Sequence, residues 1–444
     1  MENVQSTIAT PADLDRRLDD TTASAGLPPR LTGHLPALDG LRGLAIVLVL
    51  LCHFLPYSDQ PHSAMGRLFF FVGRCGWCGV DLFFVLSGFL ITGILFDAKN
   101  SAHYFRNFYA RRTLRIFPLY YGVLAVIFIV IPLVHPAAFA GKAEQAVRHD
   151  QAWLWTYCGN LRMAMQQDMY AFGGGWINLN PFWSLSVEEH FYLIWPAVVF
   201  FCSRRTLLWI SVACMVVGLV VKIDLSLLPG DHFASIYVLT PSRMDALACG
   251  ALLALLMRGP RAQARMVLWW ARPVAVVCGI LALLTISRGD ANGPIISSLN
   301  YTLLALGFGG LLLWAITAPA SSAVARTFTF RGLRTLGKYS YGLYVYHVTL
   351  LPLMDRLFGQ RKMQRWLESH LHLGHAAYGL SVVLFILMAA TASFAAAFAS
   401  WHLYERHFLK LKRYFEYRRK PAPARGAEEP DAIAAPLQVA AAPK

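Results

Sequence analysis

An arginine and a histidine interrupt the first apolar segment of the chain, Leu38 to Leu55. On a helix, Arg42 and His53 would share one face, separated by roughly 16 Å along the axis. An arginine stays charged and binds phosphate or carboxylate with a fork of donors, whereas a histidine exchanges a proton near neutral pH. Because ionisable groups within a membrane span are costly, the pair predicts an anion clamp and a proton-handling group. The alternative is a pair of polar residues that join neighbouring membrane helices.

A second basic pair follows the second apolar segment. Arg112 and Arg115 are three residues apart, so they would share one helix face. Such a pair suits a phosphate-bearing ligand that arrives from the cytoplasm. A basic cluster that only fixes the orientation of a span is an equal alternative.

Polar residues recur in the later apolar segments. Glu188 and Glu189 interrupt the fourth, so each must be paired, neutral or facing a cavity. Ser87 and Gly88, at mid-depth in the second, allow a neighbouring helix to approach closely. The other ionisable residues in these segments are Asp81, Arg243, Asp245 and His347. Inward polarity from several spans predicts a solvated or substrate-filled cavity.

Composition indicates the elements that hold these residues. The chain is 56% hydrophobic and 15% charged, far more apolar than a water-soluble core of 444 residues requires. It is therefore predicted to be an all-α integral membrane protein with about ten spans around a polar cavity. The predicted spans are 37–57, 76–97, 116–134, 182–202, 207–222, 236–257, 267–287, 297–318, 339–355 and 377–402.

Basic residues predict the orientation of the spans. Arginine clusters at 106–115, 204–205, 258–272 and 326–334 all fall on one side if both termini are cytoplasmic. Orientation thus explains most of the net charge of +15, and a nucleic-acid partner is not expected because the arginines are spread over short loops. The longest outer loop, 135–181, is predicted to be a partly helical lid or re-entrant piece.

The ends of the chain are polar. Residues 1–33 have no apolar stretch of the kind found in cleavable signals and are predicted to be a cytoplasmic tail. Residues 34–408 are predicted to form the transmembrane domain. Residues 409–444 are predicted to be a basic and then disordered cytoplasmic tail, rich in proline and alanine.

Two groups could bind metal or change redox state. Cys75 and Cys78 have the spacing of a redox motif but precede a membrane helix, so they are interpreted as loop residues, with a local disulfide as an alternative. His370, His372 and His375 are interpreted as an interfacial polar segment rather than a metal site, because few other ligands accompany them.

The order and spacing of the motifs closely resembles the membrane acyltransferase 3 family, bacterial O-acyltransferases that modify surface polysaccharides and related molecules. The resemblance covers roughly residues 34–408. The matching blocks are Leu38 to Arg42 with His53, Phe83 to Phe89, Arg112 with Arg115, Trp183 to Leu193, Leu336 to Tyr344 with His347, and Tyr404 with Glu405.

The resemblance implies a reaction across the membrane. It implies an acyl-CoA donor in the cytoplasm, a hydroxyl acceptor on the outer side, and residence in the bacterial cytoplasmic membrane with no permanently bound cofactor. Arg42, Arg112 and Arg115 would hold the nucleotide end of the donor, and His53 would act as a general base or form an acyl-histidine. Glu188 would orient His53 or hold the acceptor, with Asp81 as a weaker candidate.

Other residues are expected to contact the acceptor or support the site: Asp39, Asp81, Ser87, Trp183, Ser184, Arg243, Asp245, Tyr341 and His347. Acetyl transfer to a glycan or lipid-linked saccharide is the default expectation, but the sequence fixes neither acyl group nor acceptor. Some members of the family carry an outward-facing hydrolase-like domain, which is not expected in this chain. Any transfer would therefore be completed within the membrane domain or handed to a separate outer-side protein. The rival class is a transporter of a polysaccharide precursor or organic anion. The sequence shows no convincing internal repeat of the kind common in transporters, which argues against this class.

Overall fold

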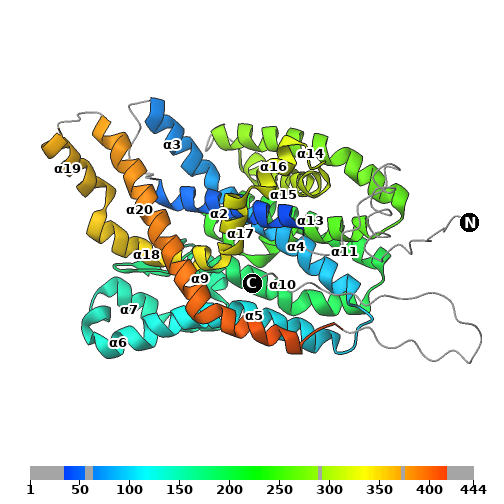
Figure 1. Ribbon diagram of the computed structural model, residues 1–444, viewed down its shortest axis with the longest axis horizontal. Helices are drawn as coiled ribbons and strands as arrows, with labels where there is room; N and C mark the ends of the chain where they lie inside the picture. The colour runs from blue at the N-terminus through cyan, green and yellow to red at the C-terminus, as the bar shows by residue number, and fades with distance from the viewer. Residues whose placement is uncertain (1–34, 56–63, 289–292, 372–375, 418–444) are drawn as a thin grey trace, which may run out of the picture.

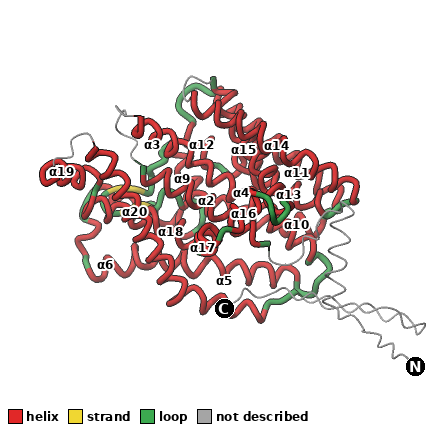
Figure 2. The backbone as a smooth tube through the Cα atoms, turned by 45° about the horizontal axis from the view of Figure 1, so that its top comes forward, coloured by secondary structure: helices red, strands yellow, loops and turns green. Residues whose placement is uncertain are grey.

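Helices make up almost all of the molecule (Figure 2). The structure, a computed structural model, describes residues 35–55, 64–288, 293–371 and 376–417. The strands in this part are a two-residue pair, β1 (Gly173–Gly174) and β2 (Ile177–Asn178). The prediction of an all-α membrane protein is confirmed.

Eight helical stretches in the described residues are long and apolar enough to span a membrane. They consist of α2 (Pro36–Phe54); α3 (Ala64–Cys75), η1 (Gly76–Cys78) and α4 (Gly79–Asp97); α5 (Tyr104–Ala125), η2 (Val126–Val130) and α6 (Ile131–Val134); α11 (Arg204–Leu227); α12 (Phe233–Val238) and α13 (Thr240–Met257); α14 (Arg261–Arg288); α15 (Pro294–Thr317); and α20 (Ala376–Ser400), η5 (Trp401–Glu405), α21 (Arg406–Lys410) and η6 (Leu411–Tyr414).

The other two predicted spans are also helices. They are α10 (Phe182–Phe201) and α18 (Ser340–Phe358), of 20 and 19 residues. At 1.5 Å per residue, each is about as long as the hydrocarbon core is thick. Neither is among the eight apolar stretches, and Glu188 and His347 lie within them. The predicted count of about ten spans therefore depends on these two polar helices.

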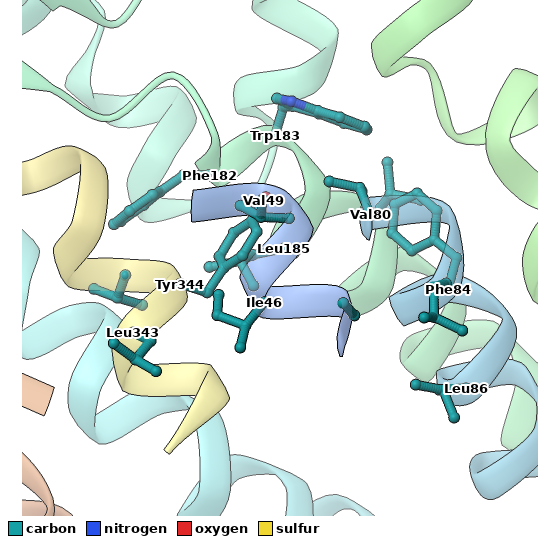
Figure 3. Packing of buried hydrophobic residues seen from close by; sticks show 14 of the residues in the cluster. Ile46, Val49, Val80, Phe84, Leu86, Phe182, Trp183, Leu185, Leu343 and Tyr344 are labelled. Carbon is teal, nitrogen blue, oxygen red and sulfur yellow. The ribbon is translucent and has the colours of Figure 1, made fainter. Parts of the chain in front are cut away.

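Helix α2, which carries Arg42 and His53, lies in the middle of the molecule (Figure 1). Its apolar residues pack between α18 and α4, with α10 close by (Figure 3). Two short helices, α16 (Ala323–Thr329) and α17 (Arg331–Lys338), also pack against α2. Neighbours on several sides fix the direction in which each polar residue of α2 points.

Close approach of α4 and α13 depends on small residues. A Cβ atom placed on Gly88 would lie 1.9 Å from the carbonyl oxygen of Leu247. This distance is too short for any side chain to fit. The expectation that Gly88 permits tight helix packing is confirmed. This contact places the polar residues of α4 beside those of α13.

The predicted outer loop is partly helical, as expected. It contains η3 (Pro136–Phe139), α7 (Lys142–His149), α8 (Gln151–Trp155), α9 (Gly159–Gln166) and the β1–β2 pair. Burial alone would raise the pKa of Asp150, but hydrogen bonds from Arg162, at 2.8 Å, and His149, at 3.0 Å, lower it overall. The resulting carboxylate links the end of α7 to α9.

The C-terminal helices lie alongside α5 (Figure 1). Residues 409–414, within the predicted C-terminal tail, are helical in α21 and η6. The disorder predicted further on, in 421–444, and the predicted N-terminal tail lie outside the described residues. The last helix to be named, α19 (Gln360–Leu371), ends just before His372 and His375, which also lie outside the described residues.

Candidate functional site

Two histidines from distant parts of the sequence meet at the centre of the molecule. His53 of α2 and His347 of α18 have ring centroids 4.9 Å apart, arranged edge to face. His347 is completely buried, whereas His53 remains partly accessible. The packing of Leu343 and Tyr344 beside Val49, visible in Figure 3, brings the two helices together at this level.

Backbone hydrogen bonds assign the same tautomer to both rings. The Nδ1 atom of His53 is 2.9 Å from the carbonyl oxygen of Val49, and that of His347 is 2.7 Å from the carbonyl oxygen of Tyr344. A carbonyl oxygen can only accept, so in each neutral ring Nδ1 carries the proton and Nε2 keeps the lone pair. Within the described part of the chain, the His347 Nε2 atom makes no hydrogen bond. In both rings Nε2 is therefore the nitrogen that carries the free lone pair.

The carboxylate of Glu188 is hydrogen-bonded to two hydroxyl groups, those of Ser87 and Tyr192. Ser87 donates a hydrogen bond of 2.6 Å to one of its carboxylate oxygens, and Tyr192 donates one of 2.9 Å to the other. Both hydrogen bonds of the carboxylate are thus used away from His53. In this structure the contacts of the His53 ring are made with the backbone of α2 and the ring of His347. The role of Glu188 in orienting His53 or holding the acceptor stays a prediction. Sequence spacing could indicate Tyr192, one helical turn after Glu188, but not Ser87, which lies on another helix.

Three arginines gather near the other end of α2, and we call Arg42, Arg112 and Arg115 the arginine cluster. Their guanidinium groups are close enough to repel one another electrostatically. Arg42 is 3.4 Å from an oxygen of Asp39 and keeps 37% of its side chain exposed. Two basic motifs far apart in the sequence therefore lie close together. Their role in holding a ligand stays a prediction.

Aromatic rings hold two members of the arginine cluster. Arg112 lies 5.1 Å from the ring centroid of Tyr192, and Arg115 lies 5.4 Å from that of Trp401. Cation–π contacts of this kind orient a guanidinium group without using its hydrogen-bond donors. Tyr192 also links Arg112 to the Ser87–Glu188 hydrogen bonds. The sequence-based prediction missed this residue, although it follows Glu188 by one helical turn.

Four charged residues of α4, α11 and α13 form what we call the buried ion-pair cluster: Asp81, Lys222, Arg243 and Asp245. Asp81 and Arg243 are 2.6 Å apart, and Lys222 pairs with Asp245. All four side chains are at most 2% exposed. Asp81, the weaker candidate for orienting His53, makes its salt bridge with Arg243. A lone lysine in the apolar segment 207–222 was the available signal for Lys222, which the prediction missed.

Aromatic residues surround Arg243. The centroids of Tyr301, Tyr237, Phe84 and Trp183 lie 4.7, 5.3, 5.6 and 5.8 Å from its guanidinium carbon. Trp183, expected to contact the acceptor, is thus one wall of this cage. The charge of Arg243 is offset by Asp81 and by these rings. Within the described residues, the Nε and Nη1 atoms of Arg243 and the Oδ2 atom of Asp81 make no hydrogen bond.

The remaining predicted residues brace the helices. Ser184 hydrogen-bonds the hydroxyl of Tyr344 at 2.5 Å, close to the histidine pair. Tyr341 donates to the carbonyl oxygen of Ile116, 2.7 Å away, which ties α18 to α5. Asp39 stays beside Arg42, as already described.

A groove of about 1200 Å³ opens beside α5 and α18. It is lined mainly by apolar residues such as Leu119, Val123, Val126 and Leu350, with Glu144 and Arg356 at polar positions. Neither histidine and no member of the arginine cluster lines it. The groove therefore follows the lipid-facing helices rather than the polar site.

The candidate metal and cysteine groups can be followed in part in the described residues. Within them, no group of three or more histidine, cysteine, aspartate or glutamate side chains is arranged to hold a metal ion. Cys75 and Cys78 are both free thiols, and η1 begins between them. The alternative of a local disulfide is therefore not realised in this structure.

Comparison with known proteins relates this geometry to a family. The family model described as an acyltransferase domain matches residues 35–402. Peptidoglycan O-acetyltransferase OatA of Listeria monocytogenes is 29% identical over 336 residues, which cover 72% of this chain and 50% of that protein. O-acetyltransferase OatA of Staphylococcus aureus is 27% identical over 351 residues, which cover 74% of this chain and 52% of that protein.

The chain thus spans about half the length of the curated relatives it matches. No solved structure matches. The family match includes both histidines and the whole arginine cluster. This chain therefore belongs to the membrane acyltransferase 3 family.

Proposed function

We propose that the protein is a membrane O-acyltransferase that moves an acyl group, acetyl by default, from acyl-CoA to a hydroxyl of a glycan. The observation that carries the proposal is the arrangement along α2. Arg42 and its cluster lie toward one end of the helix, and the His53–His347 pair lies toward the other. Their separation of roughly 16 Å is comparable to the length of the pantetheine arm of CoA.

The donor would bind by its phosphates. The arginine cluster supplies forked, permanently charged donors at the predicted cytoplasmic end, which suits the nucleotide end of acyl-CoA. The thioester would then extend along α2 toward His53. Both termini would lie in the cytoplasm of a bacterium and the protein in its inner membrane, with lipids around the apolar helices.

The transfer step follows from the histidine tautomer. The Nε2 atom of His53 takes the proton of the acceptor hydroxyl while the oxygen attacks the thioester carbon. The carbon–sulfur bond breaks, the ester forms, and the proton passes to the departing thiolate of CoA. A covalent acyl-histidine is the alternative route, in which His53 first takes the acyl group and the hydroxyl then removes it. His347 would position the His53 ring.

A glycan acceptor is supported by the names of the relatives, two of which are O-acetyltransferases. A separate outer-side protein that handles the acyl group is a further proposed partner. A lipid-linked saccharide is the membrane-bound form of the same acceptor class.

Release of CoA tests the proposal directly. Purified protein receives acetyl-CoA with and without a soluble glycan, and the free thiol is measured together with the mass of the glycan. Acceptor-dependent thiol release and an added acetyl mass are expected. Uptake of glycan or anion into vesicles, without release of thiol, would instead identify a transporter.

A further inference from the structure

The chain segment after α20 folds back onto α5 and is fixed there by side-chain contacts. Asn107, which is buried, donates a hydrogen bond of 2.8 Å to the carbonyl oxygen of Glu416. Arg111 reaches the carbonyl oxygens of Lys412 and Phe415, each at 3.4 Å. These contacts hold the backbone of η6 independently of its own side chains.

Aromatic contacts reinforce this placement. The guanidinium carbon of Arg106 lies 5.9 Å from the ring centroid of Phe415, and that of Arg111 lies 5.9 Å from that of Tyr417. Both aromatic residues, Phe415 and Tyr417, follow η6 directly in the chain. The segment is therefore attached to α5 at several points, and the position of Lys412 is defined.

The attachment brings Lys412 to the arginine cluster. Its carbonyl oxygen is 3.4 Å from Arg111, which adjoins Arg112 and precedes Arg115 by about one helical turn. The Lys412 side chain is half-buried, and the guanidinium groups of Arg115, Arg112, Arg111 and Arg42 are near enough to act on its ammonium group electrostatically. Lys412 forms no ion pair with any carboxylate in the described part of the chain. Cations from α2, α5 and η6 thus converge on one place.

Membrane orientation does not require this convergence. The retention of basic residues on the cytoplasmic side concerns loops, whereas these residues come from three separate elements. Like charges at close range oppose folding unless an anion or a carboxylate offsets them. Nearby carboxylates are limited: Asp39 pairs with Arg42, Glu405 lies near Arg115, and Glu188 is bound to Ser87 and Tyr192.

We infer that Lys412 is a further donor-binding residue, which contacts a phosphate of the nucleotide end of acyl-CoA. This inference rests on the proposed acyl-CoA donor. A lysine suits a phosphate because its ammonium is a compact charge with three rotatable donors. Lys412 lies ten residues beyond the end of the family match at residue 402. The C-terminal segment thereby completes the donor site from outside the matched region.

Variants of two neighbouring lysines test the inference. Lys412→Ala removes the ammonium but keeps the backbone carbonyl to which Arg111 donates, and Lys412→Arg keeps a positive charge. Lys410→Ala is the matched control, because Lys410 is exposed on the same segment. The assay compares acetyl-CoA with S-acetylpantetheine, a donor that lacks the nucleotide phosphates, and thermal unfolding verifies that each variant is folded.

Lys412→Ala is expected to raise the KM for acetyl-CoA about tenfold with kcat little changed, the size of one lost charge-assisted contact. The KM for S-acetylpantetheine should stay the same, Lys412→Arg should restore most of the affinity, and Lys410→Ala should match the unaltered protein. An equal effect on both donors, or none on acetyl-CoA, would overturn the inference.

Direct binding of CoA separates this inference from the proposed function. If the unaltered protein binds CoA and releases thiol from acetyl-CoA, but Lys412→Ala binds CoA equally well, only the role of Lys412 is refuted. If the unaltered protein neither binds CoA nor releases thiol, both the proposed donor and the role of Lys412 are refuted.

Discussion

The arginine cluster and the buried ion-pair cluster use the same residue types for opposite purposes. Arg243 and Asp81 are each 1% exposed, pair with each other and lie among aromatic rings. Arg42 retains 37% exposure, and its ion pair with Asp39, the one carboxylate within reach among the described residues, is 3.4 Å long. A buried charge is compensated within the protein, whereas an incompletely compensated and accessible one is available to a ligand.

The histidine pair belongs with the arginine cluster, although His347 is buried. We call these two groups together the open region, and the buried ion-pair cluster the closed region. Its Nε2 atom makes no hydrogen bond to the described residues, and its ring lies against His53, which is partly accessible. The comparison teaches that an ionisable residue in a membrane span indicates function only when its partners are known. Changes to the open region should alter turnover, and changes to the closed one should alter stability.

His53→Ala should have the largest effect on turnover. It removes the proton acceptor, so activity should fall by about 10²- to 10⁴-fold while the thermal unfolding midpoint changes little. Turnover of the purified variant is measured beside His53→Gln, which keeps a hydrogen-bonding group without base strength. Activity that survives in His53→Gln but not in His53→Ala would mean that His53 positions a substrate rather than moving a proton.

Asp81→Ala should produce the largest loss of stability. It leaves the buried charge of Arg243 without its partner, which typically costs about 3–5 kcal/mol. Thermal unfolding in detergent should show the loss, and the double variant Asp81→Ala/Arg243→Met should recover part of it. A stable Asp81→Ala protein with abolished turnover would move Asp81 from the closed region to the open one.

Helical periodicity made part of this comparison predictable. The shared face of Arg42 and His53 follows from their positions on one helix, and the predicted span 37–57 nearly coincides with α2 (Pro36–Phe54). Composition alone was sufficient for the all-helical membrane fold. The position of an apolar helix along the chain can be predicted without knowing which helices it packs against. These expectations were confirmed for that reason.

Contacts between helices could not be predicted from the sequence. The meeting of His53 with His347, and of Ser87 with Glu188, depends on how helices far apart in the chain pack together. A single sequence contains periodicity along each helix but no measure of the rotation between helices. Lys412 was assigned to a tail for a related reason, since a short basic segment has no apolar pattern that would indicate its attachment to α5.

Glu188→Gln distinguishes the observed hydrogen bonds from the role expected from the sequence. Because the carboxylate is bonded to Ser87 and Tyr192, the change should lower stability by about 1–3 kcal/mol, as for lost hydrogen bonds to a charged group. The shape of the pH–rate profile should remain that of the unaltered protein. Thermal unfolding and the pH dependence of kcat are measured together, and a changed profile at unchanged stability would return Glu188 to the catalytic site.

Arg42→Lys should have the smallest effect, confined to the donor. The charge remains but the forked geometry is lost, so the KM for acetyl-CoA should rise several-fold, by roughly 1 kcal/mol or less, with kcat nearly unchanged. Arg205→Lys is the matched control, because Arg205 is an exposed arginine of a predicted cytoplasmic loop and should leave the KM unaltered. Arg112→Ala and Arg115→Ala, measured in the same way, should weaken the donor more strongly, since they remove the charge as well. If all three changes leave the KM at the value of the control, these arginines serve only to orient the protein in the membrane, and the open region is reduced to the histidine pair.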